Sequence, residues 1–221
     1  MPFVQQIPSN NVADYIPFQE KIRYVAIGDS YSIGEGIDES GRFPNILTKH
    51  LQKRGIFIDL IANPSHTGWT TKDAIEKELP VFNESNPNFA TLLIGVNDWV
   101  QKVDEVTYRK NLRTLIEGML QKLPSPDRLI LITIPDFSAG PEGQKYGGGR
   151  NISKGIAEFN TIIKEEAAKH GCPLVDIYSI SQGMKDHPAL IAKDGLHPSA
   201  KEYELWEELI FPVAYTKIKP R

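Results

Sequence analysis

Short apolar runs alternate with segments of helical periodicity along most of this chain of 221 residues. The run at residues 89–95 is almost entirely apolar, which is typical of a strand buried on both faces of a sheet. Similar runs predict four more strands, at residues 23–28, 56–62, 128–134 and 174–177. Five segments with helical spacing lie between or after them, at residues 44–53, 70–79, 103–123, 151–170 and 199–211. This alternation predicts an α/β fold with a parallel sheet covered by helices on both faces.

The length of the chain suits one domain with its own core. Residues 1–20 are polar and irregular, so we expect an N-terminal arm there, followed by a single domain over residues 21–221. Cys172 is the only cysteine, which rules out an intrachain disulfide, and its apolar surroundings predict a buried structural thiol.

Charge and hydropathy narrow the range of partners. A net charge of −3 and a pI near 6.0 give no reason to expect nucleic acid or an anionic membrane as a partner. No apolar run approaches the roughly 18 residues that span a bilayer, so we expect no stable membrane insertion. The first twenty residues lack the features of a signal peptide, which favours a cytoplasmic protein. A secreted or periplasmic protein whose signal peptide had been removed would look the same. The oligomeric state stays open.

A serine follows the first predicted strand, where the apolar run stops abruptly at Gly28-Asp29-Ser30. In open parallel sheets, ligands and chemistry lie outside the carboxyl ends of the strands. Near the other end of the chain, Asp194 and His197 offer a carboxylate and an imidazole that one tight turn could present together. A serine, a base and a group that orients the base are the parts of nucleophilic acyl transfer.

Two further segments follow predicted strands, and with the first two they form a recognisable set. The four segments are Gly28-Asp29-Ser30, Gly68, Gly95-Val96-Asn97-Asp98 and Asp194-Gly195-Leu196-His197-Pro198. In this order they resemble the SGNH hydrolases, also called the GDSL-type lipase/esterase family. The resemblance extends over about nine-tenths of the chain. It implies a three-layer α/β/α, flavodoxin-like fold with a parallel sheet of about five strands. The family often has leucine or isoleucine after the serine, whereas Tyr31 stands here, which bears on the lining of the pocket.

The resemblance also implies a role for each residue. Ser30 would be the nucleophile, His197 its base and Asp194 the group that orients the imidazole. The backbone N–H groups of Ser30 and Gly68 and the side-chain amide of Asn97 would form the oxyanion hole. An alternative stays open for Asp194, which could form only a turn and leave a Ser–His dyad. No histidine, cysteine or carboxylate cluster has metal-ligand spacing, so we expect no metal and no cofactor.

The substrate implied is a small-molecule carboxylic ester, cleaved through an acyl-enzyme. We expect a small acyl group on a soluble substrate, such as an acetylated sugar or a simple ester. Alternatives are a lysophospholipase or thioesterase type of acyl hydrolase and an acyltransferase with the same triad. A non-catalytic binding module is disfavoured, because the chain lacks the glycine-rich phosphate-binding motifs and keeps every reacting group.

Four other interpretations depend on tertiary structure. The glycine-rich segment at residues 135–150 is either a wall of the site or a surface loop. Trp69 and Trp99 either line the pocket or belong to the core. Val106 is expected on the apolar face of its helix. The charged residues Lys201, Glu202, Glu204, Glu207 and Glu208 are expected to form a solvated helix face.

Overall fold

The computed structural model describes residues 20–219, and the core of this part is a parallel sheet. Its five strands are β1 Ile22–Gly28, β2 Ile58–Ala62, β3 Phe89–Leu93, β4 Leu129–Ile132 and β5 Leu174–Val175. They lie in the order β2-β1-β3-β4-β5, and every neighbouring pair is parallel. Apart from Glu20, the arm expected over residues 1–20 lies outside the described residues.

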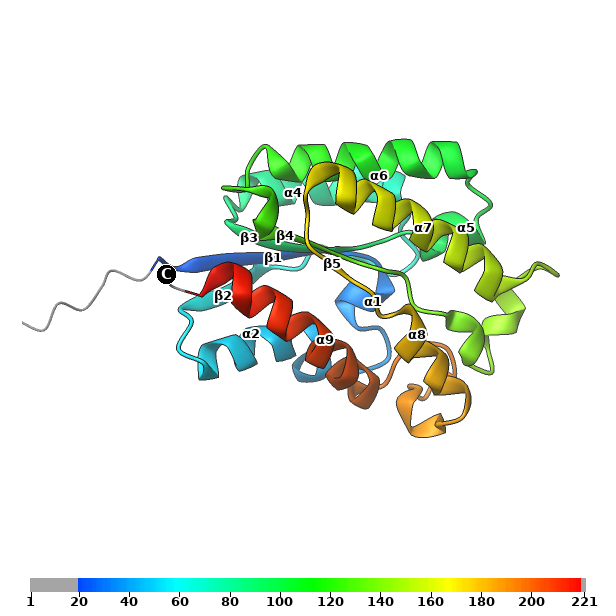
Figure 1. The fold of residues 1–221 in the computed structure, drawn as a ribbon. Coiled ribbons are helices and arrows are strands. Elements are labelled where there is room, and N and C mark those ends of the chain that lie inside the picture. Colours follow the sequence, from blue (N-terminus) through cyan, green and yellow to red (C-terminus); the bar gives the residue numbers. More distant parts are fainter. Residues whose placement is uncertain (1–19, 220–221) are drawn as a thin grey trace, which may run out of the picture.

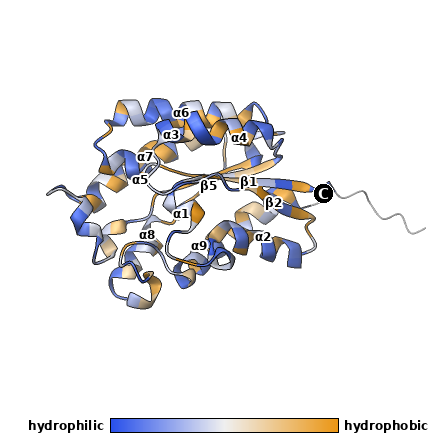
Figure 2. Cartoon of the chain, turned by 180° about the vertical axis from the view of Figure 1, so that it is seen from behind, coloured by the Kyte–Doolittle hydropathy of each residue, from blue (hydrophilic) through white to orange (hydrophobic). Residues whose placement is uncertain are grey.

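Helices cover both faces of the sheet and complete a three-layer α/β/α fold, as the sequence predicted (Figure 1). One layer holds α2 Phe43–Lys53 and α9 Ala200–Ile218, which pack against each other. The other holds α6 Glu105–Leu120 and α7 Ile152–His170. Every residue of β3 and β4 is buried between the layers, and the outward surface of α6 is largely hydrophilic (Figure 2). The apolar strand patterns therefore reflect burial on both faces.

The parallel register brings the carboxyl ends of the central strands together. Gly28, the last residue of β1, is paired with Leu93, the last residue of β3. The segments that follow these two strands consequently start side by side at one edge of the sheet.

Three short helices that the sequence did not predict begin at or near this edge. They are α1 Ser30–Ile33, α5 Val96–Val100 and α8 Tyr178–Ser181. Helices of four or five residues are too short to show a repeating apolar face. The first is capped by Asp29, whose Oδ1 accepts a hydrogen bond from Tyr31 N at 3.0 Å, and it ends at Gly34 with φ of 69°.

The helix expected to stop near Pro80 continues to residue 84, so its predicted end at residue 79 is wrong. It consists of α3 Thr71–Asp73, a π-turn over Ala74–Glu78 and α4 Leu79–Glu84. The π-turn includes a hydrogen bond from Leu79 N to Ala74 O, five residues back. It places Pro80 in the first turn of α4, where a missing N–H costs little.

The expected apolar face of α6 is wrong at one position. Val106 is 79% exposed, whereas Tyr108 is fully buried and stacks on Phe159 of α7 with ring centroids 4.3 Å apart. Tyr108 is four residues before Leu112 and so lies on the same face of the helix, while Val106 lies off it.

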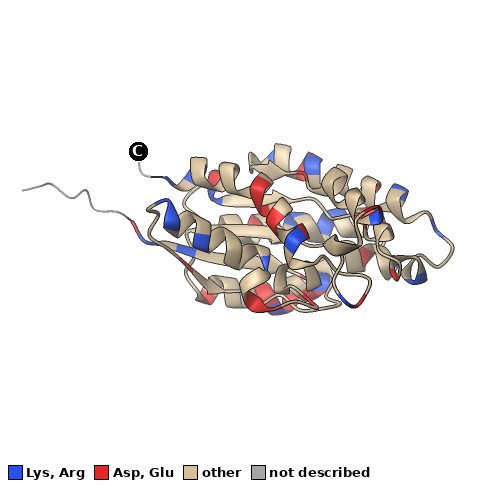
Figure 3. Ribbon diagram, turned by 90° about the horizontal axis from the view of Figure 1, so that it is seen from below, with Lys and Arg blue, Asp and Glu red and all other residues tan. Residues whose placement is uncertain are grey.

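The charged residues of α9 do not all form a solvated face. Lys201, Glu204 and Glu208 are exposed, but Glu202 and Glu207 are buried. Trp206 Nε1 donates to Glu202 Oε1 at 2.7 Å, and the Glu207 carboxylate meets His50 of α2 at 2.9 Å. Charges of both signs are interspersed over this side of the molecule (Figure 3). The buried face of α9 is wider than its pattern suggested, because α9 packs on α2 as well as on the sheet.

Cys172 is buried, as expected, and burial raises the pKa of its thiol to about 11. Such a thiol is a poor source of thiolate at neutral pH, which fits a structural role.

Candidate active site

A cavity of about 190 Å³ opens at the carboxyl edge of the sheet, where the predicted segments meet. Four of the five predicted site residues line it, namely Ser30, Gly68, Asn97 and His197. The fifth, Asp194, contacts the cavity residue His197. The other lining residues are Tyr31, Thr67, Val96, Val100, Phe137, Tyr146 and Leu196. The structure therefore brings all five predicted residues together.

Ser30 is the first residue of α1, directly beyond the end of β1. Its side chain reaches the cavity although the residue as a whole is only 5% exposed. Asp29 supplies the helix cap, so Ser30 does not serve as the cap itself. This frees the Ser30 hydroxyl for contact with a bound molecule.

Asp194 both forms the turn and contacts the imidazole of His197. Its Oδ1 accepts hydrogen bonds from Leu196 N at 2.9 Å and His197 N at 3.0 Å. Its Oδ2 lies 2.7 Å from His197 Nδ1. A carboxylate at Nδ1 fixes that nitrogen as the donor, which leaves Nε2 as the acceptor that a general base requires.

The electrostatics of this turn keep Asp194 ionised. Burial alone would raise the pKa of its carboxyl, but the hydrogen bonds from Leu196 and His197 outweigh burial and hold the pKa below its ordinary value. A charged Asp194 can stabilise the imidazolium that forms when His197 takes a proton.

Among the described residues, no hydrogen bond joins His197 to Ser30; the two side chains face the same cavity. The contact between a nucleophile and its base is often long before substrate binds. Tyr31, which also lines the cavity, lies edge-on to the imidazole with ring centroids 6.0 Å apart.

The three candidate oxyanion donors surround the same space. Within the described chain, neither Ser30 N nor Gly68 N donates a hydrogen bond, and Gly68 has φ of 85°, which favours glycine. One N–H of the Asn97 amide donates to Trp69 O at 2.9 Å, which fixes the side chain and leaves its second N–H. Gln101 Nε2 reaches Gly68 O at 3.3 Å and helps to hold the loop.

The segment at residues 135–150 forms part of the cavity wall through Phe137 and Tyr146. Arg150 attaches this segment to α5 by donating to Trp99 O at 2.7 Å and Val100 O at 3.1 Å. Its guanidinium also lies 3.7 Å from the centre of the Trp99 ring. The segment is thus a wall of the site.

The two tryptophans have different surroundings. Trp99 is 6% exposed and belongs to the core. Trp69 stacks on His66 with ring centroids 4.8 Å apart. Neither the Trp69 ring nor the His66 ring lines the cavity. The sequence did not single out Phe137, Tyr146 or Arg150 within the segment at residues 135–150, nor Leu196 as a lining residue. Only Leu196 carried a local signal, because it stands between Asp194 and His197.

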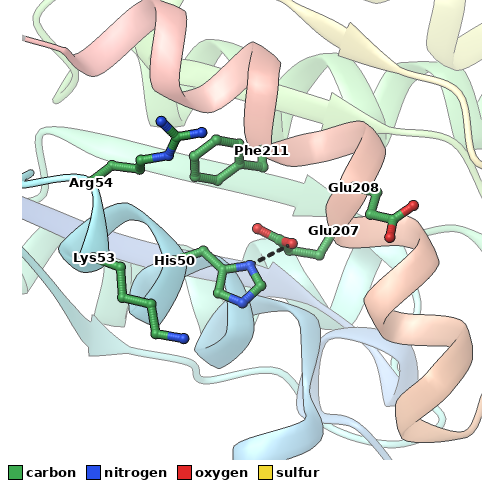
Figure 4. A pocket seen from close by; sticks show the side chains of 6 residues that line it. All are labelled: His50, Lys53, Arg54, Glu207, Glu208 and Phe211. Carbon is green, nitrogen blue, oxygen red and sulfur yellow. Dashed lines mark hydrogen bonds and ion pairs between the residues drawn. The ribbon is translucent and has the colours of Figure 1, made fainter.

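A second hollow of about 430 Å³ lies between α2 and α9, away from these residues (Figure 4). It is lined by His50, Lys53, Arg54, Glu207, Glu208 and Phe211. Burial raises the pKa of the Glu207 carboxyl, and the contact with His50 opposes this shift. None of the predicted site residues reaches this hollow.

Two kinds of feature are absent from residues 20–219. No group of three or more His, Cys, Asp and Glu side chains is placed to hold a metal ion. No helix in that range has the length and apolar character to cross a membrane.

Solved structures share this fold over almost their whole length. A lipase/acylhydrolase from Enterococcus faecalis is 25% identical, with a TM-score of 0.70 over 90% of this chain and 98% of its own. A variant of the acetyl xylan esterase Axe2 from Geobacillus stearothermophilus is 19% identical, with a TM-score of 0.68 over 91% and 96%. The esterase EstA from Pseudoalteromonas sp. is 18% identical, with a TM-score of 0.67 over 90% and 99%.

Comparison of the sequence with known families shows which family the chain belongs to. A comparison with curated proteins gave no significant match. The profile of the GDSL-like Lipase/Acylhydrolase family, in contrast, matches residues 26–205, which include all four motif segments. The chain therefore belongs to the GDSL-like lipase/acylhydrolase family, the SGNH hydrolases, and is a hydrolase that acts on esters.

Proposed function

We propose that this protein is a serine esterase in which Ser30 is the nucleophile, His197 the base and Asp194 the group that orients His197. The observation that carries the proposal is the 2.7 Å contact between His197 Nδ1 and Asp194 Oδ2 beside a cavity that Ser30 also lines. This arrangement supplies a nucleophile, a base with one tautomer and a space for the reacting carbonyl.

The reaction would pass through an acyl-enzyme. Ser30 Oγ attacks the ester carbonyl and its proton moves to His197 Nε2. The oxyanion that forms accepts hydrogen bonds from Ser30 N, Gly68 N and Asn97 Nδ2. The C–O bond to the alcohol breaks, and the alcohol leaves with the proton from His197. Water then attacks the acyl group and gives a proton to His197. The bond from the acyl carbon to Ser30 Oγ breaks, Ser30 takes that proton from His197, and the acid is released.

We infer a small acyl group on a soluble substrate, such as an acetylated sugar or a simple ester. The modest cavity volume and its apolar wall of Val96, Val100, Phe137 and Leu196 support an acyl chain of a few carbons. The fold shared with an acetyl xylan esterase and with EstA is in keeping with this class. A lysophospholipase or thioesterase would show a preference for longer chains or for thioesters, and an acyltransferase would favour an added alcohol over water.

Hydrolysis of p-nitrophenyl esters from acetyl to palmitoyl tests the proposal. Ser30→Ala is expected to lower kcat by at least about 10⁴-fold while the protein stays folded, because the nucleophile is lost. Ser85→Ala is the matched control, since Ser85 follows α4 at the opposite edge of the sheet and its hydroxyl, among the residues that the structure describes, bonds only to Val81 O. A folded Ser30→Ala protein with normal turnover would refute the mechanism.

A further inference from the structure

A buried glutamate lies directly behind the proposed nucleophile. Glu78, at the end of the π-turn, is fully buried, and its Oε2 accepts a hydrogen bond from Gly28 N at 3.0 Å. Gly28 is two residues before Ser30. The paired register between β1 and β2 ends at Val25 and Ala62, so Gly28 N has no strand partner on that side. Glu78 supplies the acceptor that the sheet does not.

Gly28 is also closely packed against β3 and α1. A Cβ atom at this position would lie 2.3 Å from Leu93 O and 2.3 Å from Ser32 Oγ. The end of β1 is therefore fixed between β3 and α1 on one side and the Glu78 carboxyl on the other. Single π-turns within helices often occur at functional sites, and this one determines where Glu78 points.

The surroundings of Glu78 disfavour its charged form. The pKa of Glu78 is raised to about 8, chiefly by burial and to a smaller extent by the neighbouring Asp29 and Asp73, while the hydrogen bond from Gly28 opposes the rise. Burial likewise raises the pKa of Asp29 to about 7, with Asp98 of α5 adding to the effect. Glu78 Oε1 and Asp29 Oδ2 are both buried without a hydrogen-bond partner in the described part of the chain.

The charged and titratable groups around this pair are mostly acidic. Asp73 belongs to the same helix as Glu78, and Asp98 accepts hydrogen bonds from Thr71 N at 2.8 Å and Thr71 Oγ1 at 2.5 Å. The buried Tyr108 hydroxyl of α6 donates to Ile94 O at 3.1 Å and interacts with both Asp98 and Asp29. Another negative charge here would lie close to the segments that carry the proposed oxyanion donors.

We propose that Glu78 is a positioning residue for Ser30, which holds the Gly28-Asp29-Ser30 main chain through Gly28 N and does so as a neutral carboxyl group. The proposal rests on Ser30 as the nucleophile. A neutral carboxyl keeps an acceptor oxygen for Gly28 N. An ionised one would place a like charge behind the developing oxyanion and weaken its stabilisation.

Steady-state hydrolysis of p-nitrophenyl acetate between pH 6 and pH 10 tests this, with folding followed by circular dichroism. The wild-type kcat is expected to fall about tenfold from pH 7 to pH 10 as Glu78 loses its proton. Glu78→Gln, which is neutral and keeps an acceptor, should stay within about twofold of wild type at pH 7 and lose most of that alkaline fall. Glu78→Met, which has no comparable acceptor, should lower kcat about tenfold or more at pH 7 with little change in KM.

Glu76→Gln is the control, because Glu76 is exposed on the same helix and should follow the wild-type pH profile. A Glu78→Gln enzyme whose kcat at pH 7 is at least tenfold below wild type would overturn the neutral form, because glutamine reproduces that form. A folded Glu78→Met enzyme with wild-type kcat would overturn the positioning role. If Glu78→Met does not fold, the kcat of Glu78→Gln at pH 7 decides alone. Activity that survives Ser30→Ala would refute the proposed function instead, whereas Ser30-dependent activity with unaltered Glu78 variants would refute only this inference.

Discussion

At the scale of single residues, Asn97 shows how a common side chain acquires a specific geometry. One of its two amide N–H groups is used to bond Trp69 O, so the side chain cannot rotate freely. The next residue, Asp98, is fixed to Thr71 by two hydrogen bonds. The remaining N–H of Asn97 is therefore oriented before any substrate arrives, which is the condition for effective oxyanion stabilisation.

Asn97→Asp should lower kcat by about 10²- to 10³-fold with a smaller effect on KM, because a donor is replaced by a negative charge of almost the same shape. The measurement is steady-state hydrolysis of p-nitrophenyl acetate. Asn45→Asp on α2, whose amide contacts the side chain of Glu39, is the control and should leave kcat unchanged. An Asn97→Asp enzyme as active as wild type would remove Asn97 from the oxyanion hole.

At the scale of elements, the segment at residues 135–150 depends on one side chain for its attachment. Arg150 bonds two carbonyl groups of α5 and one of its own segment, Gly147 O at 3.1 Å, while it stacks on Trp99. The planar guanidinium makes these contacts simultaneously, which a lysine ammonium cannot do. Arg150 therefore keeps the Tyr146 side of the cavity wall in place.

Arg150→Lys should raise KM for p-nitrophenyl esters about three- to tenfold with a smaller change in kcat, because the wall loosens while the catalytic groups stay in place. Amide hydrogen exchange across residues 140–149 should become faster in the variant. Lys154→Arg, an exposed substitution nearby in α7, is the control. Unchanged exchange and unchanged KM would show that Arg150 does not hold the wall.

The helices and strands also show which elements can be predicted from local sequence patterns. All five strands were predicted within a few residues. The apolar runs of β3 and β4 record burial on both faces of the sheet, whereas the edge strand β2 is only partly buried. The short helices α1, α5 and α8 were missed, since a single turn has no periodicity to read. The end of the helix at Pro80 was misplaced because the sequence does not show the π-turn that lets the chain continue.

At the scale of the whole molecule, buried carboxyl groups couple stability to pH. Burial raises the pKa of Glu202 to about 7 and that of Asp98 to about 6, and Asp29 and Glu78 are shifted in the same direction. Because these pKa values lie above those of the unfolded chain, the folded protein retains protons that the unfolded chain has already released. Their contribution to stability is complete below about pH 4 and is lost as pH rises through about 6 to 8.

The free energy of unfolding should therefore fall by about 2 kcal/mol or more between pH 5 and pH 9, as measured by urea unfolding. Glu202→Gln should reduce that fall by about 1–3 kcal/mol, because the buried Glu202 no longer ionises. Glu204→Gln, at an exposed position of α9, should behave as wild type. If wild type and Glu202→Gln differ by the same amount at both pH values, Glu202 does not ionise within this range.

The sequence by itself determined the class of fold and the position of each candidate site residue along the chain. Strand and helix periodicity, the glycine turns and the Asp194–His197 spacing are local properties, and parallel strands necessarily bring their carboxyl ends to one edge. The tertiary structure alone decided that Phe137 and Tyr146 wall the cavity, that Glu202 and Glu207 are buried and that Glu78 holds Gly28. These features depend on which distant segments pack together, and no local pattern of residues records the shape and charge of a neighbour that lies far away in the sequence.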